Sequence, residues 1–182
     1  EKLGWEQPQW YEANEALVAK YEHRIFKREG WAAQYWSPII EAEQLHMQRN
    51  AGLYDATAVK KRLEISGEGA LAFLQTLTTS NIDIPVGQVT KTLMLHELAG
   101  IKDEITVIRK RKDTFFILCT GAVEASWIEK HVPESGKVVI HDQTAGMCGL
   151  GVMGAKANEI MQSIDPAGFA KEAWAPGQAK EL

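Results

Sequence analysis

The chain has 182 residues, of which 45% are hydrophobic and 24% are charged. This length supports one domain with a sizeable core, or one and a half domains. The formal net charge of −4 gives no electrostatic reason to expect a nucleic acid as a partner. No segment is long and apolar enough to cross a bilayer, so we expect no membrane partner either.

The first 36 residues are rich in aromatic and charged side chains, and we predict a linker or helical segment over 1–36. Asn14 can cap a helix that Gly30 would end. Four of the six tryptophans lie here: Trp5, Trp10, Trp31 and Trp36. They need an apolar surface to pack on, in this chain or in a neighbour. Because the chain begins without Met, we also expect a missing leader or upstream domain.

From residue 37 onward, helical and strand patterns alternate. Ser37 and Pro38 can begin a helix, with proline at its first position. Helical spacing also predicts helices over 69–77, 121–132 and 155–164. Alternating or continuous apolar patterns predict strands over 53–57, 61–67, 88–97, 104–110, 114–120, 137–144 and 147–154. Short links between three consecutive strands predict an antiparallel meander, and therefore an α+β fold with a mostly antiparallel sheet and flanking helices.

The residues that commonly carry chemistry are few. No Walker loop, GxGxxG or HExxH motif occurs, and no histidine stands at metal-ligand spacing, so no metal is predicted. Cys119 and Cys148 each lie in an apolar run, which predicts buried thiols in a reducing compartment. Basic residues cluster at 60–62 and 109–112, near strand ends, where solvated turns are more usual than a phosphate site.

Two adjacent acids, Asp103 and Glu104, stand where a turn becomes a strand. Neighbouring side chains on a strand point to opposite faces, so the two carboxylates cannot share one site. Glu104 would share its face with Thr106, and Asp103 would share the more aliphatic face with Ile105 and Val107. The aliphatic face is usually the core. The pattern alone leaves open whether these are solvated turn acids or include a functional acid.

Residues 66–109, SGEGALAFLQTLTTSNIDIPVGQVTKTLMLHELAGIKDEITVIR, resemble the folate-binding aminomethyltransferase family. That family includes the T-protein of the glycine cleavage system and the folate-binding C-terminal portions of dimethylglycine and sarcosine dehydrogenases. Residues 36–43 and 52–57 are similar to the approach to this motif. Residues 6–15 resemble the segment that joins the flavin and folate halves of the dehydrogenases. The resemblance implies the N-terminal part of an aminomethyltransferase-like folate-binding fold over 37–182, incomplete at its C-terminus.

The resemblance also implies a set of site residues. Glu104 matches the family's usual aspartate, which faces the pterin and its bridge nitrogens, although glutamate has a longer arm. Asp103 takes the preceding, more variable position. The implied folate-lining residues are Thr106, Thr120, Tyr54, Leu93 and Leu95. For the two leucines, core packing is the more usual role.

The implied activity is one-carbon transfer to tetrahydrofolate. A methylated amine, or its iminium, would supply the carbon and the product would be 5,10-methylenetetrahydrofolate, in a dimethylglycine/sarcosine dehydrogenase-like or glycine cleavage system. FAD would take part only if a flavin domain or a flavoprotein subunit is attached. The alternatives are a folate-dependent O- or S-demethylase, and a non-catalytic module that binds folate or docks on a flavoprotein. The expected compartment is the cytoplasm, or the mitochondrial matrix in a eukaryote.

Overall fold

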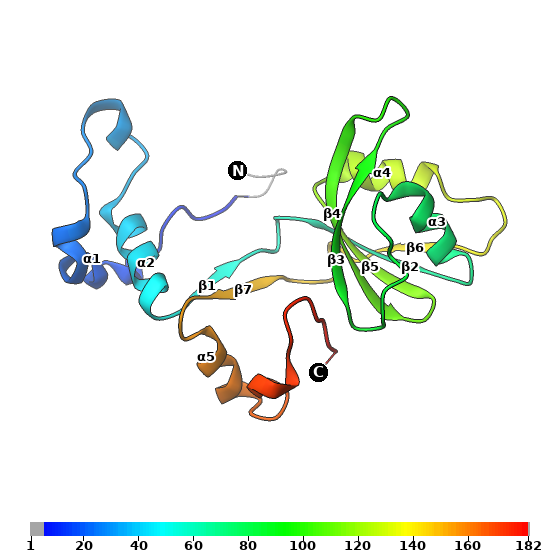
Figure 1. The fold of residues 1–182 in the computed structure, drawn as a ribbon. Coiled ribbons are helices and arrows are strands. Elements are labelled where there is room, and N and C mark those ends of the chain that lie inside the picture. The colour runs from blue at the N-terminus through cyan, green and yellow to red at the C-terminus, as the bar shows by residue number, and fades with distance from the viewer. Residues whose placement is uncertain (1–5, 182) are drawn as a thin grey trace. The chain divides into compact units, whose positions relative to one another are not determined.

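A computed structural model describes residues 6–181 of the chain (Figure 1). These residues form two compact units. Unit 1 runs to Asp55 and resumes over Leu150–Ala173, and unit 2 comprises Ala56–Gly149 together with the tail from Trp174 onward. The predicted division of the whole protein at residue 36 stays a prediction.

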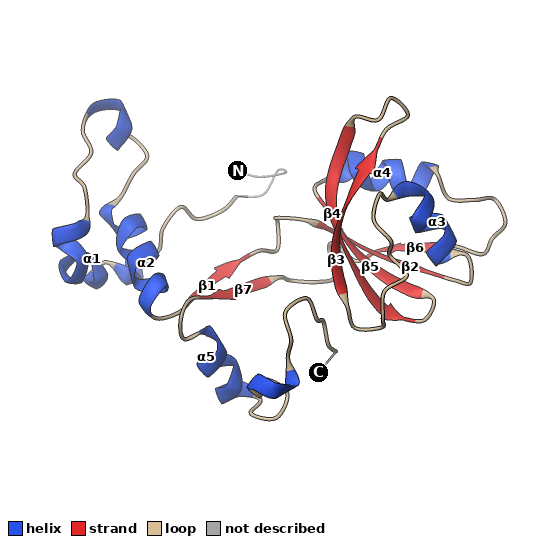
Figure 2. Cartoon of the chain, viewed as in Figure 1, coloured by secondary structure: helices blue, strands red, loops and turns tan. Residues whose placement is uncertain are grey.

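Unit 2 is built on a five-stranded antiparallel sheet (Figure 2). Its strands are β2 (Lys61–Ser66), β3 (Val89–Leu95), β4 (Ile101–Arg111), β5 (Thr114–Cys119) and β6 (Val139–Asp142), in the spatial order β3-β4-β5-β2-β6. The predicted meander of β3, β4 and β5 is confirmed. Strand β4 begins at Ile101, three residues before the predicted start, so both acids lie inside the strand and not at its entrance.

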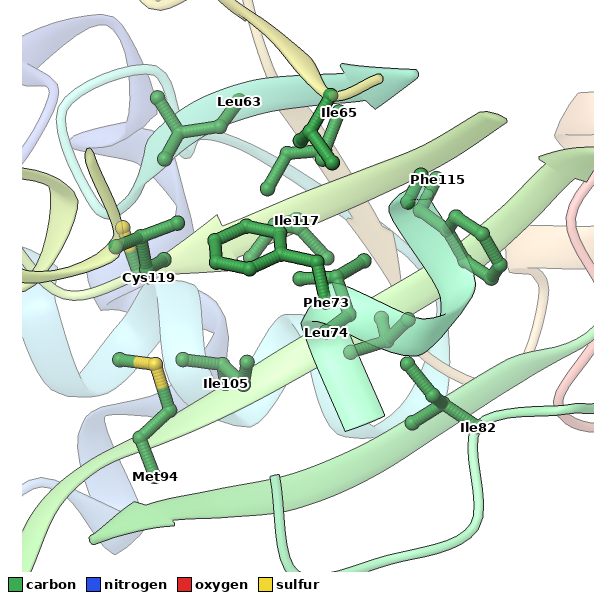
Figure 3. Packing of buried hydrophobic residues seen from close by; sticks show 14 of the residues in the cluster. Leu63, Ile65, Phe73, Leu74, Ile82, Met94, Ile105, Phe115, Ile117 and Cys119 are labelled. Carbon is green, nitrogen blue, oxygen red and sulfur yellow. The ribbon is translucent and has the colours of Figure 1, made fainter. Parts of the chain in front are cut away.

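Helices α3 (Ala70–Leu77) and α4 (Ala122–Lys130) pack on one face of this sheet. Every second residue of the central strands points toward them and is buried, as the period of two in a strand requires. Figure 3 shows this core beside α3. The residues labelled there are Leu63, Ile65, Phe73, Leu74, Ile82, Met94, Ile105, Phe115, Ile117 and Cys119. The α+β fold class with a mostly antiparallel sheet is therefore confirmed.

The sheet face away from the two helices, here called the open face, carries the other half of each strand. Strand pairing arranges its side chains in three rows: Val89, Ile108, Phe116 and Glu64; then Lys91, Thr106, Leu118 and Arg62; then Leu93 and Glu104. Most of the apolar members are half-buried. β5 is apolar on both faces, which is the pattern of a strand that is covered on both sides.

Unit 1 contains the remaining elements. They are α1 (Ala16–Tyr21), α2 (Pro38–Arg49), β1 (Gly52–Asp55), β7 (Leu150–Met153), α5 (Ala157–Ile164) and the short 3-10 turns Glu12–Asn14, Glu22–Arg24, Gly30–Ala33 and Lys171–Ala173. β1 and β7 pair antiparallel as a two-stranded ribbon. The predicted start of α2 is confirmed, since the Ser37 hydroxyl accepts a hydrogen bond from the Ile39 amide at 3.3 Å.

The prediction of one helix between Asn14 and Gly30 is wrong. The α-helix ends at Tyr21, and Ile25 is already extended. The side chain of Asn14 caps nothing; it donates a 2.7 Å hydrogen bond to a carboxylate of α2, Glu43. A second α2 carboxylate, Glu41, binds the Phe26 amide and the Arg28 guanidinium. These tertiary contacts outweigh the local helix propensity of the segment.

The two cysteines differ from each other. Cys119 is buried in the core, as predicted, whereas Cys148 is exposed in the loop before β7, so the prediction that it is buried is wrong. Cys148 is exposed because its apolar segment lies in a loop, where no described helix or sheet packs over it. Trp31 is 88% exposed, and Trp5 lies outside the described residues. No helix within residues 6–181 is long and apolar enough to span a membrane.

Candidate functional site

The adjacent acids of β4 point to opposite sides of the sheet, as strand alternation predicts. Asp103 lies on the helix side, where both of its carboxylate oxygens are engaged by Thr120. The Thr120 amide donates to Oδ2 at 2.8 Å and its hydroxyl donates to Oδ1 at 2.7 Å. The Lys60 ammonium in turn donates to the Thr120 hydroxyl oxygen at 3.1 Å. Asp103 therefore fastens β4 to the turn between β5 and α4.

Glu104 lies on the open face and has a different environment. Its side chain is 61% exposed, and its Oε1 atom lies 3.4 Å from the Lys91 ammonium. Leu93 stands directly opposite it on β3. An exposed ion pair of this kind holds its carboxylate weakly, by about 0–1 kcal/mol. The Glu104 carboxylate is thus the one of the pair that can accept hydrogen bonds from a ligand on the open face.

The other predicted site residues of unit 2 divide between these two environments. Thr106 lies in the middle row of the open face, between Lys91 and Leu118. Leu93 is half-buried on the same face and outside the core cluster, while Leu95 follows a register shift in the β3–β4 pairing. Thr120 lies with Asp103 and not with Glu104.

Tyr54 belongs to unit 1, where it pairs with Gly151 in the β1–β7 ribbon and is 41% exposed. It lines a groove of about 860 Å³ between α1, α2 and this ribbon, together with His46 and Met47. The structure therefore places Tyr54 in a groove of its own unit, and its predicted contact with folate stays a prediction.

Sequence reasoning missed a cavity on the open face. About 200 Å³ of space lies between the sheet row of Ile108 and Phe116, the loop at Met147, and the tail at Ala179 to Glu181. The basic run 109–112, which the sequence indicated as a solvated turn, contributes Arg109 and Lys110 to its wall. The signal that could have found it is the apolar pattern of β5 on both faces, which requires a cover on the side away from the helices.

The chemistry that these groups support is binding and proton transfer more than nucleophilic attack. Burial, and then the nearby Asp103 charge, raise the pKa of the Cys119 thiol to about 12, so it stays protonated and inert. Among residues 6–181, no group of three metal-ligating side chains could hold an ion. What remains is a carboxylate, a hydroxyl and apolar walls on one face, which suits a flat ring with polar edges.

The described residues of unit 2 thus form an α+β domain whose open face carries Glu104, Thr106 and apolar side chains. Comparison with known proteins gives the family. Residues 1–182 match the GCVT N-terminal domain, and the chain belongs to that family.

Its relatives include the aminomethyltransferase of Chlorobaculum parvum, 32% identical over 135 residues that cover 72% of this chain and 36% of that protein. The mitochondrial pyruvate dehydrogenase phosphatase regulatory subunit of Mus musculus is 25% identical over 172 residues, 92% of this chain and 19% of that protein. The crystal structure of the glycine cleavage system aminomethyltransferase T from Bartonella henselae has a similar fold, with a TM-score of 0.64 at 20% identity; the match covers 89% of this chain and 45% of that one. The chain thus spans less than half of the length of each of these relatives.

Proposed function

We propose that this chain is part of a tetrahydrofolate-dependent enzyme that transfers the one-carbon unit of a methylated amine to give 5,10-methylenetetrahydrofolate, once a flavin has oxidised the amine to its iminium. The observation that supports the proposal is the placement of Glu104. Its exposed carboxylate shares the open face with Thr106 and Leu93, on a domain whose relatives include aminomethyltransferases.

The donor set fits a reduced pterin. Tetrahydrofolate would supply the two nitrogens, N5 and N10, that receive the carbon. Glu104 would accept a proton, or a hydrogen bond, from a ring or bridge N–H, and Thr106 would hydrogen-bond a polar edge. Leu93 and Leu118 would cover the ring faces. Most of the rate would come from holding both reactants together, which explains why a nucleophile and its base are not needed here.

Asp103 and Thr120 take a supporting role in this proposal. Because the Thr120 amide and hydroxyl both donate to the Asp103 carboxylate, the two residues fix the end of β4 that carries Glu104. Leu95 is proposed as an outer wall of this site, and a contact of Tyr54 with folate stays a prediction from the sequence. A fixed backbone at Glu104 would matter for the transfer, because a small displacement of a reacting group lowers the reaction rate by a large factor.

For the system to which the chain belongs, we favour the dimethylglycine/sarcosine dehydrogenase type over glycine cleavage. The support is the likeness of residues 6–15 to the segment joining the flavin and folate halves. A flavoprotein domain or subunit carrying FAD would then produce the iminium. The relative from Mus musculus is named as mitochondrial, which supports the mitochondrial matrix in a eukaryote.

A second candidate function is a non-catalytic module that binds folate or docks on a partner. The observation in its favour is that a relative matching 92% of this chain is named as a regulatory subunit. The two candidates differ in one result, because a module of this kind would bind without transferring carbon.

The test is an anaerobic titration of the full-length protein with tetrahydrofolate, read by tryptophan fluorescence, followed by an assay of the folate product after addition of dimethylglycine as the one-carbon donor and an electron acceptor for its oxidation to the iminium. Saturable binding with 5,10-methylenetetrahydrofolate as product is expected. Glu104→Gln should reduce transfer, whereas Glu97→Gln, in the exposed hairpin between β3 and β4, is the matched control and should not. Binding without any transfer would support the module, methyltetrahydrofolate would indicate a demethylase, and the absence of binding would refute the proposal.

A further inference from the structure

The segment of unit 1 that joins the 3-10 turn Glu22–Arg24 to α2, residues 25–36, is here called the aromatic loop. Figure 1 shows it in blue, extending away from α1 and α2. It carries three large aromatic side chains that are 73–88% exposed: Phe26, Trp31 and Tyr35. Single exposed apolar side chains are ordinary, but three on one short loop form a patch of the kind that marks an interaction surface.

The base of the aromatic loop is fixed to α2 by Glu41. The Phe26 amide donates to Glu41 Oε2 at 3.2 Å, and the Arg28 guanidinium donates to Oε1 at 3.0 Å. The same guanidinium lies over the Trp36 ring, 5.5 Å from its centroid. A loop that is already ordered loses less conformational entropy when it binds, so these contacts prepare its aromatic side chains for a partner.

Unit 1 also contains a groove of complementary chemistry, the space of about 860 Å³ between α1, α2 and the β1–β7 ribbon. Leu17 and Met47 contribute apolar surface to it, and Glu43 lies in its wall. The Glu43 carboxylate accepts hydrogen bonds from two neutral donors, the Tyr11 amide at 3.1 Å and the Asn14 side chain at 2.7 Å. Among the described residues, no Lys or Arg side chain lines the groove or pairs with this carboxylate, so its negative charge is available to a partner.

We propose that the aromatic loop of one chain inserts into this groove of a second copy of the chain, with Trp31 against the apolar walls and Lys27 beside Glu43. Lys27 is exposed and forms no ion pair with a described residue, so its charge can complement that of Glu43. The groove volume lies within the range of about 300–1,000 Å³ that receives drug-sized molecules, which are larger than an indole ring.

The occupant is a second copy because each chain carries both halves of the contact on one unit. Two copies related by a two-fold axis would exchange their loops, and both grooves would be filled in a closed dimer. Lys27, Trp31 and Glu43 lie outside the folate site proposed above. The inference therefore concerns association and goes beyond the proposed function.

The first test is sedimentation velocity of the full-length protein over a range of concentrations. We expect a concentration-dependent equilibrium between monomer and dimer. Trp31→Ala should weaken the association about 30-fold, the usual loss when an aromatic anchor is removed from the centre of an interface. Leu98→Ala is the matched control, because Leu98 is also 88% exposed but lies in the hairpin between β3 and β4; it should leave the association unchanged.

The second test reverses the two charges in separate chains. Lys27→Glu and Glu43→Lys each set like charges against each other, so each variant should associate with itself at least ten-fold more weakly than the parent. An equimolar mixture of the two variants pairs opposite charges at both contacts and should restore the dimer. Circular dichroism checks the fold of each variant. Should Glu43→Lys fail to fold, Trp31→Ala still decides the matter, because its exposed side chain is not part of the core.

Three results would each overturn the inference: a monomer at every concentration, a dimer that Trp31→Ala leaves intact, or folded charge variants whose mixture associates no better than either alone. A monomer in which tetramethylammonium shifts the Met47 methyl signal in NMR spectra would assign the groove to a small organic cation instead. None of these results depends on tetrahydrofolate binding or transfer, which test the proposed function separately.

Discussion

Thr120 donates two short hydrogen bonds to the Asp103 carboxylate, at 2.8 Å from its amide and at 2.7 Å from its hydroxyl. These bonds distinguish Asp103 from Glu104, the neighbouring acid of β4. The acid whose oxygens are both satisfied lies on the helix side. The exposed acid, Glu104, lies on the open face beside Lys91.

The Asp103–Thr120 pair should contribute to stability and little to chemistry. Asp103→Ala should lower the free energy of unfolding by about 1–2 kcal/mol, because charge-assisted hydrogen bonds are lost from a partly exposed site. Thr120→Val should cost less, because the backbone amide of residue 120 still donates to Asp103. The double variant should cost less than the sum, since both changes remove the bond from the Thr120 hydroxyl to Asp103. Denaturant unfolding measures all three. A fully additive double variant would contradict the pairing.

Glu104 should show the opposite behaviour. Glu104→Gln should leave the free energy of unfolding within about 0.5 kcal/mol of the parent, because the side chain is an exposed surface group. Its one-carbon transfer should fall by about 100-fold or more, the usual size of a lost general base. Steady-state assays with saturating tetrahydrofolate measure this. If Asp103→Asn in a folded protein were the more damaging change to transfer, Glu104 would not be the functional acid.

The tail should loosen in acid. The folded-state pKa of Glu181 is lowered, so its contribution is present above the usual value of 4.5 and is lost as the pH falls through the lower folded value. The pKa of Lys110 is raised, so its contribution persists at neutral pH and is lost only above 10.5. The Ala179 amide resonance, which reports the bond to Gly87, should therefore shift toward its unfolded position below pH 4.5. In Glu181→Gln this acid-induced shift should be absent.

The two thiols should react at very different rates. Cys119 is buried and its pKa is raised to about 12, whereas Cys148 is exposed. Iodoacetamide at about pH 8 should therefore modify Cys148 in the native protein and reach Cys119 only after unfolding. Peptide mass mapping before and after denaturant measures the two sites. Native modification of Cys119 at the rate of Cys148 would contradict the core packing.

Gly67, between β2 and α3, and Gly136, in the loop between α4 and β6, offer a matched test of backbone space. Both have positive φ, at 117° and 70°, but a Cβ at Gly67 would collide with the Lys137 carbonyl oxygen, while one at Gly136 meets nothing within 4 Å. Gly136→Ala should lower the melting temperature slightly through the φ penalty alone. Gly67→Ala should lower it much further. Thermal unfolding followed by circular dichroism compares them, and equal losses would be inconsistent with the close approach.

Several elements could be predicted from local sequence because local chemistry decides them. Ser37 and Pro38 start α2 through a cap that involves only neighbouring residues. Asp103 and Glu104 could be assigned to opposite faces because adjacent residues of any strand alternate between its two sides. The segment near Asn14 could not be predicted in this way, because the Glu43 carboxylate that repositions it lies 29 residues further along the chain.

The sequence by itself determined the fold class, the meander and the family, since these depend on strand periodicity, short hairpin links and a long motif over 66–109. Only the tertiary structure decided which acid is engaged, because the partner of Asp103 is Thr120, 17 residues away and just past the end of the next strand. It also decided that the tail at Glu181 lies over Ile108 and Lys110. No local pattern encodes such contacts, because they form when segments far apart in the chain come together over a sheet.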